Sequence, residues 1–194
     1  MVLRQPVGPA AARDRSSFRP KVGGGGCRSR TADGNELVID GDGRAGPRAV
    51  LFEGSSSRTA STQARWDTHE RGVLTLLRGE LVSATGEVAE PWIVWRLLSA
   101  NNRELGRGVG AFPSSSAARA AVERVIGRAD QLDSASAFAL DRGQHAWALH
   151  LDDDFVVIAP RWHRSRRANR ENLTIALDSL RHARLSTVVT LLSR

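Results

Sequence analysis

Two segments of this chain share one outline, and that outline constrains the fold more than any other feature of the sequence. Residues 95–108 read WRLLSANNRELGRG, and residues 147–160 read WALHLDDDFVVIAP. Each segment begins with a tryptophan on an apolar run typical of a strand, passes through a short polar stretch and returns as a second strand-like run. Asn and Asp in these polar stretches favour tight turns, because they tolerate positive φ. Each segment is therefore predicted to be a β-hairpin.

A helix is predicted after each hairpin, and the two helices share the same spacing of apolar residues. The positions follow an i, i+3, i+4, i+7 pattern, which places four side chains on one stripe that packs against a sheet. The stripes consist of Ala118, Ala121, Val122 and Val125 in the first helix, and of Leu173, Ala176, Leu177 and Leu180 in the second. The first helix is expected to begin with a cap at Ser114 or Ser115 and to end at Gly127. The second helix is expected to begin with a cap at Ser165 or Asn169.

These patterns predict an α+β fold made of two tandem β-β-β-α repeats, each an antiparallel sheet covered by a helix. The first repeat is expected at 72–130, with its opening strands at 72–77 and 80–86, and the second at 131–194. One such unit alone leaves a sheet face or edge uncovered, which is a physical reason for two units to pack together. The apolar run at 185–192 is expected to be a last strand that pairs with a sheet edge or with a second chain.

Residues 1–65 differ in composition from the rest of the chain. Gly, Pro, Ser and Arg dominate there, as in the run GGGG at 23–26. Such a segment buries too little apolar surface to offset its ordering entropy. It is predicted to be a largely disordered basic tail, in which the apolar runs 36–40 and 48–52 form at most an isolated hairpin.

The residues of the first hairpin and helix resemble the YegP-like repeat family. The matching positions are Trp95, Arg96, Leu97, Ala100, Asn101, Arg103, Phe112 and the helix from Ser114. Members are small bacterial α+β domains, commonly in two tandem copies, with no assigned biochemical activity. The resemblance is good over 79–128 and weaker over 136–184. It implies a fold, whereas function has to be inferred from sites.

The chain is strongly basic, with a formal net charge of +7. Lys21 is its single lysine, so nearly all of the positive charge is arginine. Two interpretations remain open at this stage. The charge either serves contact with a polyanion or reflects the arginine-rich coding of a GC-rich genome.

The candidate binding site is the segment RWHRSRRANR at residues 161–170, which contains no acidic residue. Arginine binds phosphate bidentately, and tryptophan offers a surface on which a base can stack. Cations near a helix N-terminus also oppose the helix dipole, which indicates a role other than helix stability. The predicted nucleic-acid-binding residues are Arg161, Trp162, Arg164, Arg166, Arg167 and Arg170. The alternative is a solvated loop.

Other motifs predict no catalytic, metal-binding or cofactor-binding residues. The single cysteine, Cys27, excludes an intramolecular disulfide and a cysteine-based zinc site. The acidic run 152–154 is interpreted as a turn, and His145 and His150 fall on opposite faces of one strand. Nucleotide-binding glycine motifs and nucleophile motifs are absent. The sequence has no membrane-spanning run and no secretory signal, so a cytoplasmic location is expected.

These features favour a non-catalytic binding or structural module. The partner is expected to be nucleic acid or an acidic protein. The competing hypothesis is a homodimer through a sheet edge, or a protein partner, with no nucleic-acid role. A small-ligand enzyme with a pocket between the repeats is the minor alternative.

Overall fold

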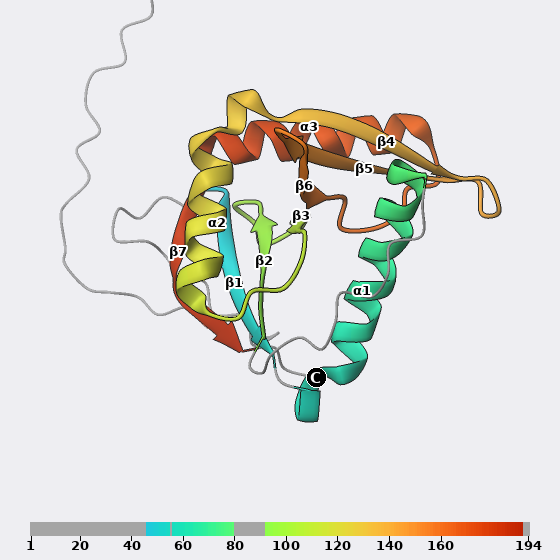
Figure 1. The fold of residues 1–194 in the computed structure, drawn as a ribbon. Helices are drawn as coiled ribbons and strands as arrows, with labels where there is room; N and C mark the ends of the chain where they lie inside the picture. Colours follow the sequence, from blue (N-terminus) through green and yellow to red (C-terminus); the bar gives the residue numbers. More distant parts are fainter. Residues whose placement is uncertain (1–45, 55, 80–91, 192–194) are drawn as a thin grey trace, which may run out of the picture. The chain divides into compact units, whose positions relative to one another are not determined.

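The computed structural model describes residues 46–54, 56–79 and 92–191, without the side chains of 56–63 (Figure 1). Contacts divide the chain into Met1–Val38 and Ile39–Arg194, and every described residue belongs to the second unit. Its helices are α1 Ser56–Arg78, α2 Ser115–Gly127, α3 Arg166–His182 and a short 3-10 turn at Ala129–Gln131. Its strands are β1 Arg48–Gly54, β2 Trp92–Leu98, β3 Glu104–Gly108, β4 Asp133–Ala139, β5 Gln144–Leu151, β6 Asp154–Ile158 and β7 Arg184–Leu191.

The described strands form one seven-stranded sheet in the order β4-β5-β6-β3-β2-β1-β7. β7 runs parallel to β1, and the remaining neighbours are antiparallel. The predicted α+β class is therefore confirmed. The two halves of the sheet meet at a short β3–β6 pairing, Arg107↔Ile158 and Gly108↔Val157.

Both predicted hairpins are confirmed, as β2–β3 and β5–β6. Their turns contain Asn102 at φ 63° and Asp152 at φ 57°, the left-handed backbone that Asn and Asp tolerate. The hairpins also correspond in register, with Leu97 opposite Gly106 in one and Leu149 opposite Val157 in the other. In each, the register shifts directly after that leucine.

The prediction for the start of the first repeat is wrong. Residues 72–77, expected to be a strand, belong to α1, where Val73 and Leu74 are buried together in the core. A short apolar run is compatible with a buried helix as well as with a strand, so the spacing of its apolar residues does not distinguish the two. The second expected strand, 80–86, lies outside the described residues. The predicted tandem β-β-β-α arrangement is not confirmed. The order β4, β5, β6 and α3 is the one predicted for the second repeat, but the strand that precedes and pairs with β2 is β1, outside the bounds expected for the first.

The predicted tail is also corrected where the structure describes it. Residues 48–54, expected within the tail, form β1, which lies between β2 and β7 with Leu51 fully buried. Residues 56–65 begin α1. Residues 1–45, including the predicted strand 36–40, lie outside the described residues.

Helices α2 and α3 begin at the predicted caps. The Ser114 hydroxyl accepts a hydrogen bond from the Ala117 N–H, and the Ser165 hydroxyl accepts one from the Ala168 N–H, both at 3.2 Å. α2 ends at Gly127, also as predicted.

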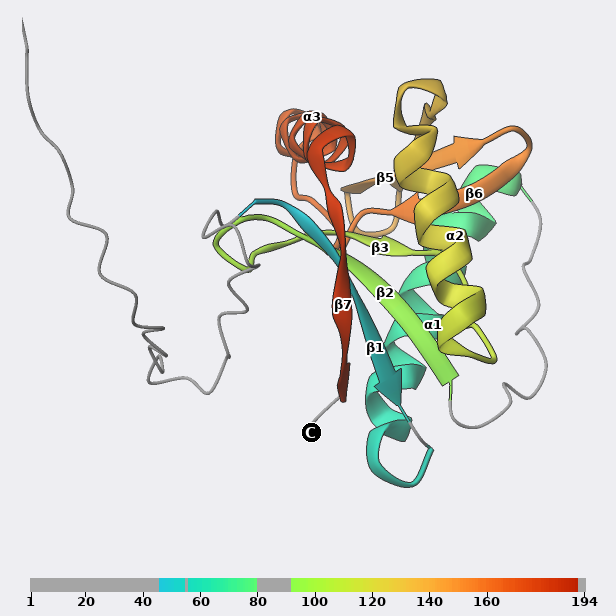
Figure 2. The same cartoon turned by 90° about the vertical axis from the view of Figure 1, so that its left-hand side faces the viewer.

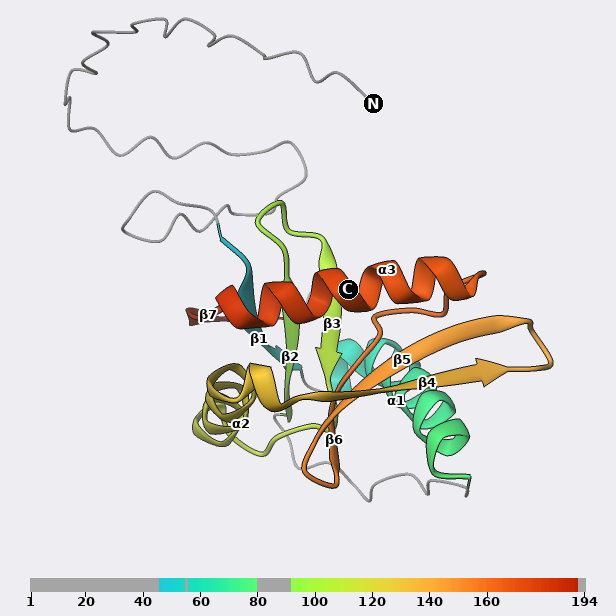
Figure 3. The same ribbon diagram turned by 90° about the horizontal axis from the view of Figure 1, so that it is seen from above.

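The helices cover both faces of the sheet. Odd-numbered side chains of β2, such as Trp95, join the large core that includes Val122 of α2 and Leu180 of α3. The even-numbered Trp92 and Val94 pack instead against Trp66 of α1. Because side chains alternate along a strand, α1 lies across β2 from α2 (Figure 1). Figure 3 shows α3 crossing the sheet from the side of the β4–β5 hairpin towards β7.

The two hairpin tryptophans are core residues, as predicted, with exposed fractions of 1% for Trp95 and 0% for Trp147. The Trp147 indole N–H donates to Oδ1 of Asn172 at 2.9 Å, which satisfies its buried polar atom. Trp95 lies directly over Gly108, where a Cβ would come within 2.0 Å of the indole Nε1. Glycine at this position is therefore a packing requirement.

The last strand pairs with β1 of the same chain at the edge of the sheet (Figure 2). The register of β7 is irregular around Ser186–Val188. There the Arg119 guanidinium donates to the carbonyl oxygens of Ser186 and Thr187, and the Val188 N–H donates to the Ser186 hydroxyl. Such contacts and irregularities reduce the capacity of an edge strand to pair with another chain.

We expect Gly108→Ala to lower the free energy of unfolding by about 2–3 kcal/mol, because the added methyl group overlaps the Trp95 ring and the core has to shift. Urea denaturation followed by circular dichroism measures this change. Gly127→Ala is the control, since a Cβ there meets nothing within 4 Å. It should change stability by less than about 1 kcal/mol. Equal effects of the two substitutions would contradict the packing requirement.

Candidate nucleic-acid interface

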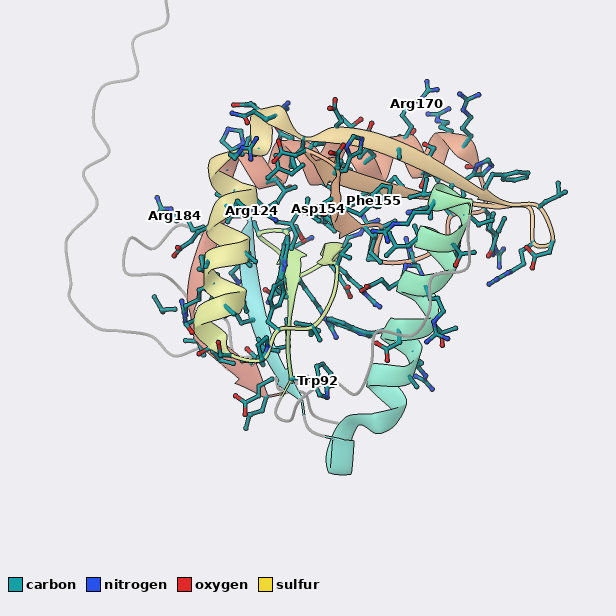
Figure 4. All side chains as sticks on the ribbon, in the orientation of Figure 1. Trp92, Arg124, Asp154, Phe155, Arg170 and Arg184 are labelled. Carbon is teal, nitrogen blue, oxygen red and sulfur yellow. The ribbon has the colours of Figure 1, made fainter. Side chains whose placement is uncertain are left out.

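The predicted arginine segment connects β6 to α3. Arg161 and Arg164 lie in the connection, and the other three arginines lie in the first two turns of the helix. All five side chains are exposed, namely those of Arg161, Arg164, Arg166, Arg167 and Arg170, whereas Trp162 is half-buried. Figure 4 shows Arg170 projecting outward from α3.

One of these arginines is neutralised locally. The Arg167 Nε lies 2.7 Å from Oε1 of Glu171, one turn further along α3. Arginines elsewhere are paired in a similar way, as in the contacts of Arg128 with Asp152 and of Arg181 with Asp130. Within the described residues, the side chains of Arg161, Arg164, Arg166 and Arg170 form no ion pair. We call these four residues the arginine surface.

The histidine of the segment does not belong to that surface. His163 is 6% exposed, and its backbone forms a two-way bridge with His145, with N–H to oxygen distances of 2.7 and 2.8 Å. Burial, followed by the neighbouring positive charge of Arg161, lowers the pKa of His163. The main-chain bridge at this position fixes the backbone next to Trp162.

Trp162 packs against the margin of the core and contacts side chains of α1 and of the β4–β5 turn. Its ring centroid lies 5.9 Å from that of His69, edge to face, and 5.6 Å from the guanidinium carbon of Arg142. These side chains line a pocket of about 390 Å³. The described lining residues are Ala64, Arg65, Thr68, His69, Gly72, Arg142 and Trp162.

The polar groups of the pocket have defined roles. The Nε2 atom of His69 lies 2.7 Å from the Ala159 carbonyl oxygen and has to donate, because a carbonyl only accepts. Burial lowers the pKa of His69, which favours the neutral ring and leaves Nδ1 as an acceptor. The Thr68 hydroxyl donates to the Ala64 carbonyl oxygen at 2.6 Å. Arg65 and Arg142 add donors, of which the Arg142 Nε already donates to Asp141 at 3.1 Å. This set suits a planar or anionic ligand.

A charged layer between α1 and the sheet holds the helix that forms one wall of the pocket. The Arg96 guanidinium lies between the rings of Phe52 and Trp66, at 4.6 and 4.7 Å from their centroids. Burial lowers the pKa of Arg96, and Glu104 at 3.6 Å opposes this shift. Arg107 bonds the same glutamate and lies 5.0 Å from the Trp66 centroid. Cation–π contacts and a shared carboxylate therefore anchor α1.

Glu70, next to the pocket histidine, fixes α1 at a second point. Both of its carboxylate oxygens accept from the Gly110 N–H, at 3.0 and 3.1 Å. Burial raises the pKa of Glu70, although the Gly110 N–H acts in the opposite direction.

Sequence reasoning identified the arginines and Trp162 but missed the contribution of α1 to the pocket. Arg65 and His69 lie in a region assigned to a tail and a gap before a strand. One pattern in the sequence does indicate the helix α1. Apolar side chains recur there at helical spacing, at Trp66, Val73 and Leu77, which are two turns and then one turn apart. Arg142 comes from the β4–β5 turn, so the sequence contains no local indication of its place in the pocket.

A metal-binding cluster and a membrane-spanning helix are both absent from the described residues. No three His, Cys, Asp or Glu side chains there are grouped to hold a metal ion. None of the helices in this part of the chain combines the length and apolar character needed to cross a membrane.

Comparison with known proteins gives one structural similarity. No family model and no curated protein matches the chain. Among solved structures, the chain is similar to the solution NMR structure of yegP from E. coli, a protein of unknown function. The match has a TM-score of 0.36 and 10% sequence identity, and covers 53% of this chain and 82% of that one.

We expect Glu70→Gln to raise the free energy of unfolding relative to wild type more at neutral pH than at low pH. A raised pKa means that folded Glu70 holds its proton to a higher pH than the unfolded chain does. The wild type therefore loses stability as pH rises from about 4 through the folded pKa, and the neutral glutamine does not. Urea unfolding of both proteins from acid to neutral pH measures the difference in free energy. A difference that is constant with pH would show that packing alone separates the two.

Proposed function

We propose that this protein is a non-catalytic module that binds nucleic acid through the arginine surface and Trp162. The observation that carries the proposal is the state of Arg161, Arg164, Arg166 and Arg170. Their side chains are exposed and unpaired within the described residues, next to a half-buried aromatic ring.

Phosphate groups are suitable partners for such a surface. A guanidinium matches two phosphate oxygens with two parallel N–H donors, and each neutralised phosphate releases condensed counterions. An acidic protein would satisfy the same charges. The presence of Trp162 favours nucleic acid, because a base can stack on an indole ring whereas a carboxylate gains little from it.

The described lining of the pocket supports binding in preference to catalysis. It contains no carboxylate and no cysteine, and His69 is engaged with the Ala159 carbonyl. Acid–base or nucleophilic chemistry needs a positioned partner for the histidine. Glu70 is occupied with the Gly110 N–H. A role in nucleic-acid binding is consistent with the cytoplasmic location expected from the sequence.

A salt series tests the proposal on the full-length protein. Fluorescence anisotropy with labelled single- and double-stranded DNA should give a dissociation constant that rises steeply with salt. Arg166→Gln with Arg170→Gln should weaken binding and lower the slope of log K against log salt by about 2, roughly one for each lost phosphate contact.

Arg124→Gln with Arg103→Gln is the matched control, because it removes two exposed positive charges that form no ion pair within the described residues and lie outside the arginine surface; Figure 4 shows Arg124 on α2. This control should retain the wild-type slope. Equal weakening by both pairs would mean that net charge acts without a site, and the arginine surface would be rejected. Absence of binding by the wild type would redirect the search to an acidic protein or to a homodimer, for which a native mass of twice the 21.0 kDa chain is the indicator.

A further inference from the structure

We infer that the nucleic acid bound by this protein is single-stranded and that one unpaired base enters the pocket beside Trp162. This inference rests on the proposed function and goes further by naming the form of the ligand. It is carried by the position of the pocket, by its lining and by a glycine inside α1.

The pocket adjoins the arginine surface through the chain itself. Trp162 lines the pocket, Arg161 precedes it directly and Arg164 follows two residues later. With consecutive Cα atoms about 3.8 Å apart, these three residues can contact neighbouring nucleotides of one strand. Phosphates would meet the guanidiniums while a base meets the indole ring.

The lining suits a base better than a phosphate alone. Trp162 and His69 provide aromatic surfaces, and Nδ1 of His69 is left as an acceptor for an N–H group. Arg65 and Arg142 provide donors for base oxygens or for the adjoining phosphate. In a duplex the bases are stacked and paired, so entry into this pocket would require unpairing.

Gly72 provides an independent argument for a pocket that is kept open. It lies inside α1, where glycine is less favourable than alanine because of its backbone freedom. A Cβ at this position would lie 3.7 Å from Cζ2 of Trp162, an ordinary contact distance, so packing does not require glycine. The residue is locally unfavourable in the helix, and the space it leaves against the tryptophan ring has the size of one methyl group.

Filling that space is the test. Gly72→Leu places a side chain in the pocket and favours the helix, and Gly72→Ala is the control that favours the helix but adds only a methyl group. The probes are a fluorescein-labelled oligothymidylate, an abasic strand of the same length and a duplex of that length. We expect Gly72→Leu to weaken binding of oligothymidylate roughly 5- to 150-fold, the range for loss of one stacked base, and to leave abasic and duplex binding unchanged. Gly72→Ala should bind all three probes nearly as the wild type does.

A second variant covers the case in which Gly72→Leu fails to fold, as judged by circular dichroism. Trp162→Leu removes the stacking ring and keeps an apolar side chain, and should give the same selective loss for oligothymidylate. Wild-type affinity of either folded variant for oligothymidylate overturns the inference, as does equal weakening for the abasic strand. In both cases binding through the arginine surface stands if it still depends on Arg166 and Arg170, whereas wild-type affinity of Trp162→Leu would remove Trp162 from the proposed function. A wild-type protein that binds none of the probes overturns both.

Discussion

The sheet of this protein depends on two tryptophans that pack over a strand with glycines in place of side chains. Trp95 lies against Gly108, and Trp147 reaches Gly106, where a Cβ would come within 3.2 Å of the indole ring. Both glycines belong to β3, the strand that joins the two halves of the sheet through β6. A side chain at position 108 would displace the Trp95 ring, and one at position 106 would press on Val157 and Trp147. Only two residue pairs join β3 to β6. The junction is therefore stabilised mainly by the indole rings, which pack directly on the β3 backbone at its glycines.

The parts of the fold that could be predicted are those coded by neighbouring residues. Turn residues such as Asn102, serine caps such as Ser114, and helical stripes act over a few positions, so the sequence shows them directly. The pairing of β1 with β2 and β7 joins segments far apart in the chain and leaves no local pattern. The run at 72–77 was assigned to the wrong element because a buried helix and a buried strand share an unbroken apolar sequence. Global packing decides between them.

The candidate site likewise has one part that is visible in the local sequence and one part that is not. The arginines from Arg161 to Arg170 are consecutive enough to be recognised in the sequence. The pocket is assembled from α1, the β4–β5 turn and Trp162, so it exists only after folding. The position of α1 depends on the charged layer, in which Arg96 and Glu104 add to the apolar contacts that Trp66, Val73 and Leu74 make with the rest of the fold. A buried cation without these partners would be strongly destabilising, so the layer orients α1 as well as attaching it.

The parallel pairing of β7 with β1 has a consequence for synthesis. Arg48 of β1 lies opposite Arg184 of β7, so translation has to continue for more than a hundred residues after β1 before this partner exists (184 − 48 = 136). During that interval the outer edge of β1 can pair with other nascent chains, because an open strand edge is a template for association. Contacts of such long sequence separation also form slowly. The chain is therefore most prone to aggregation before β7 has been made and has covered this edge.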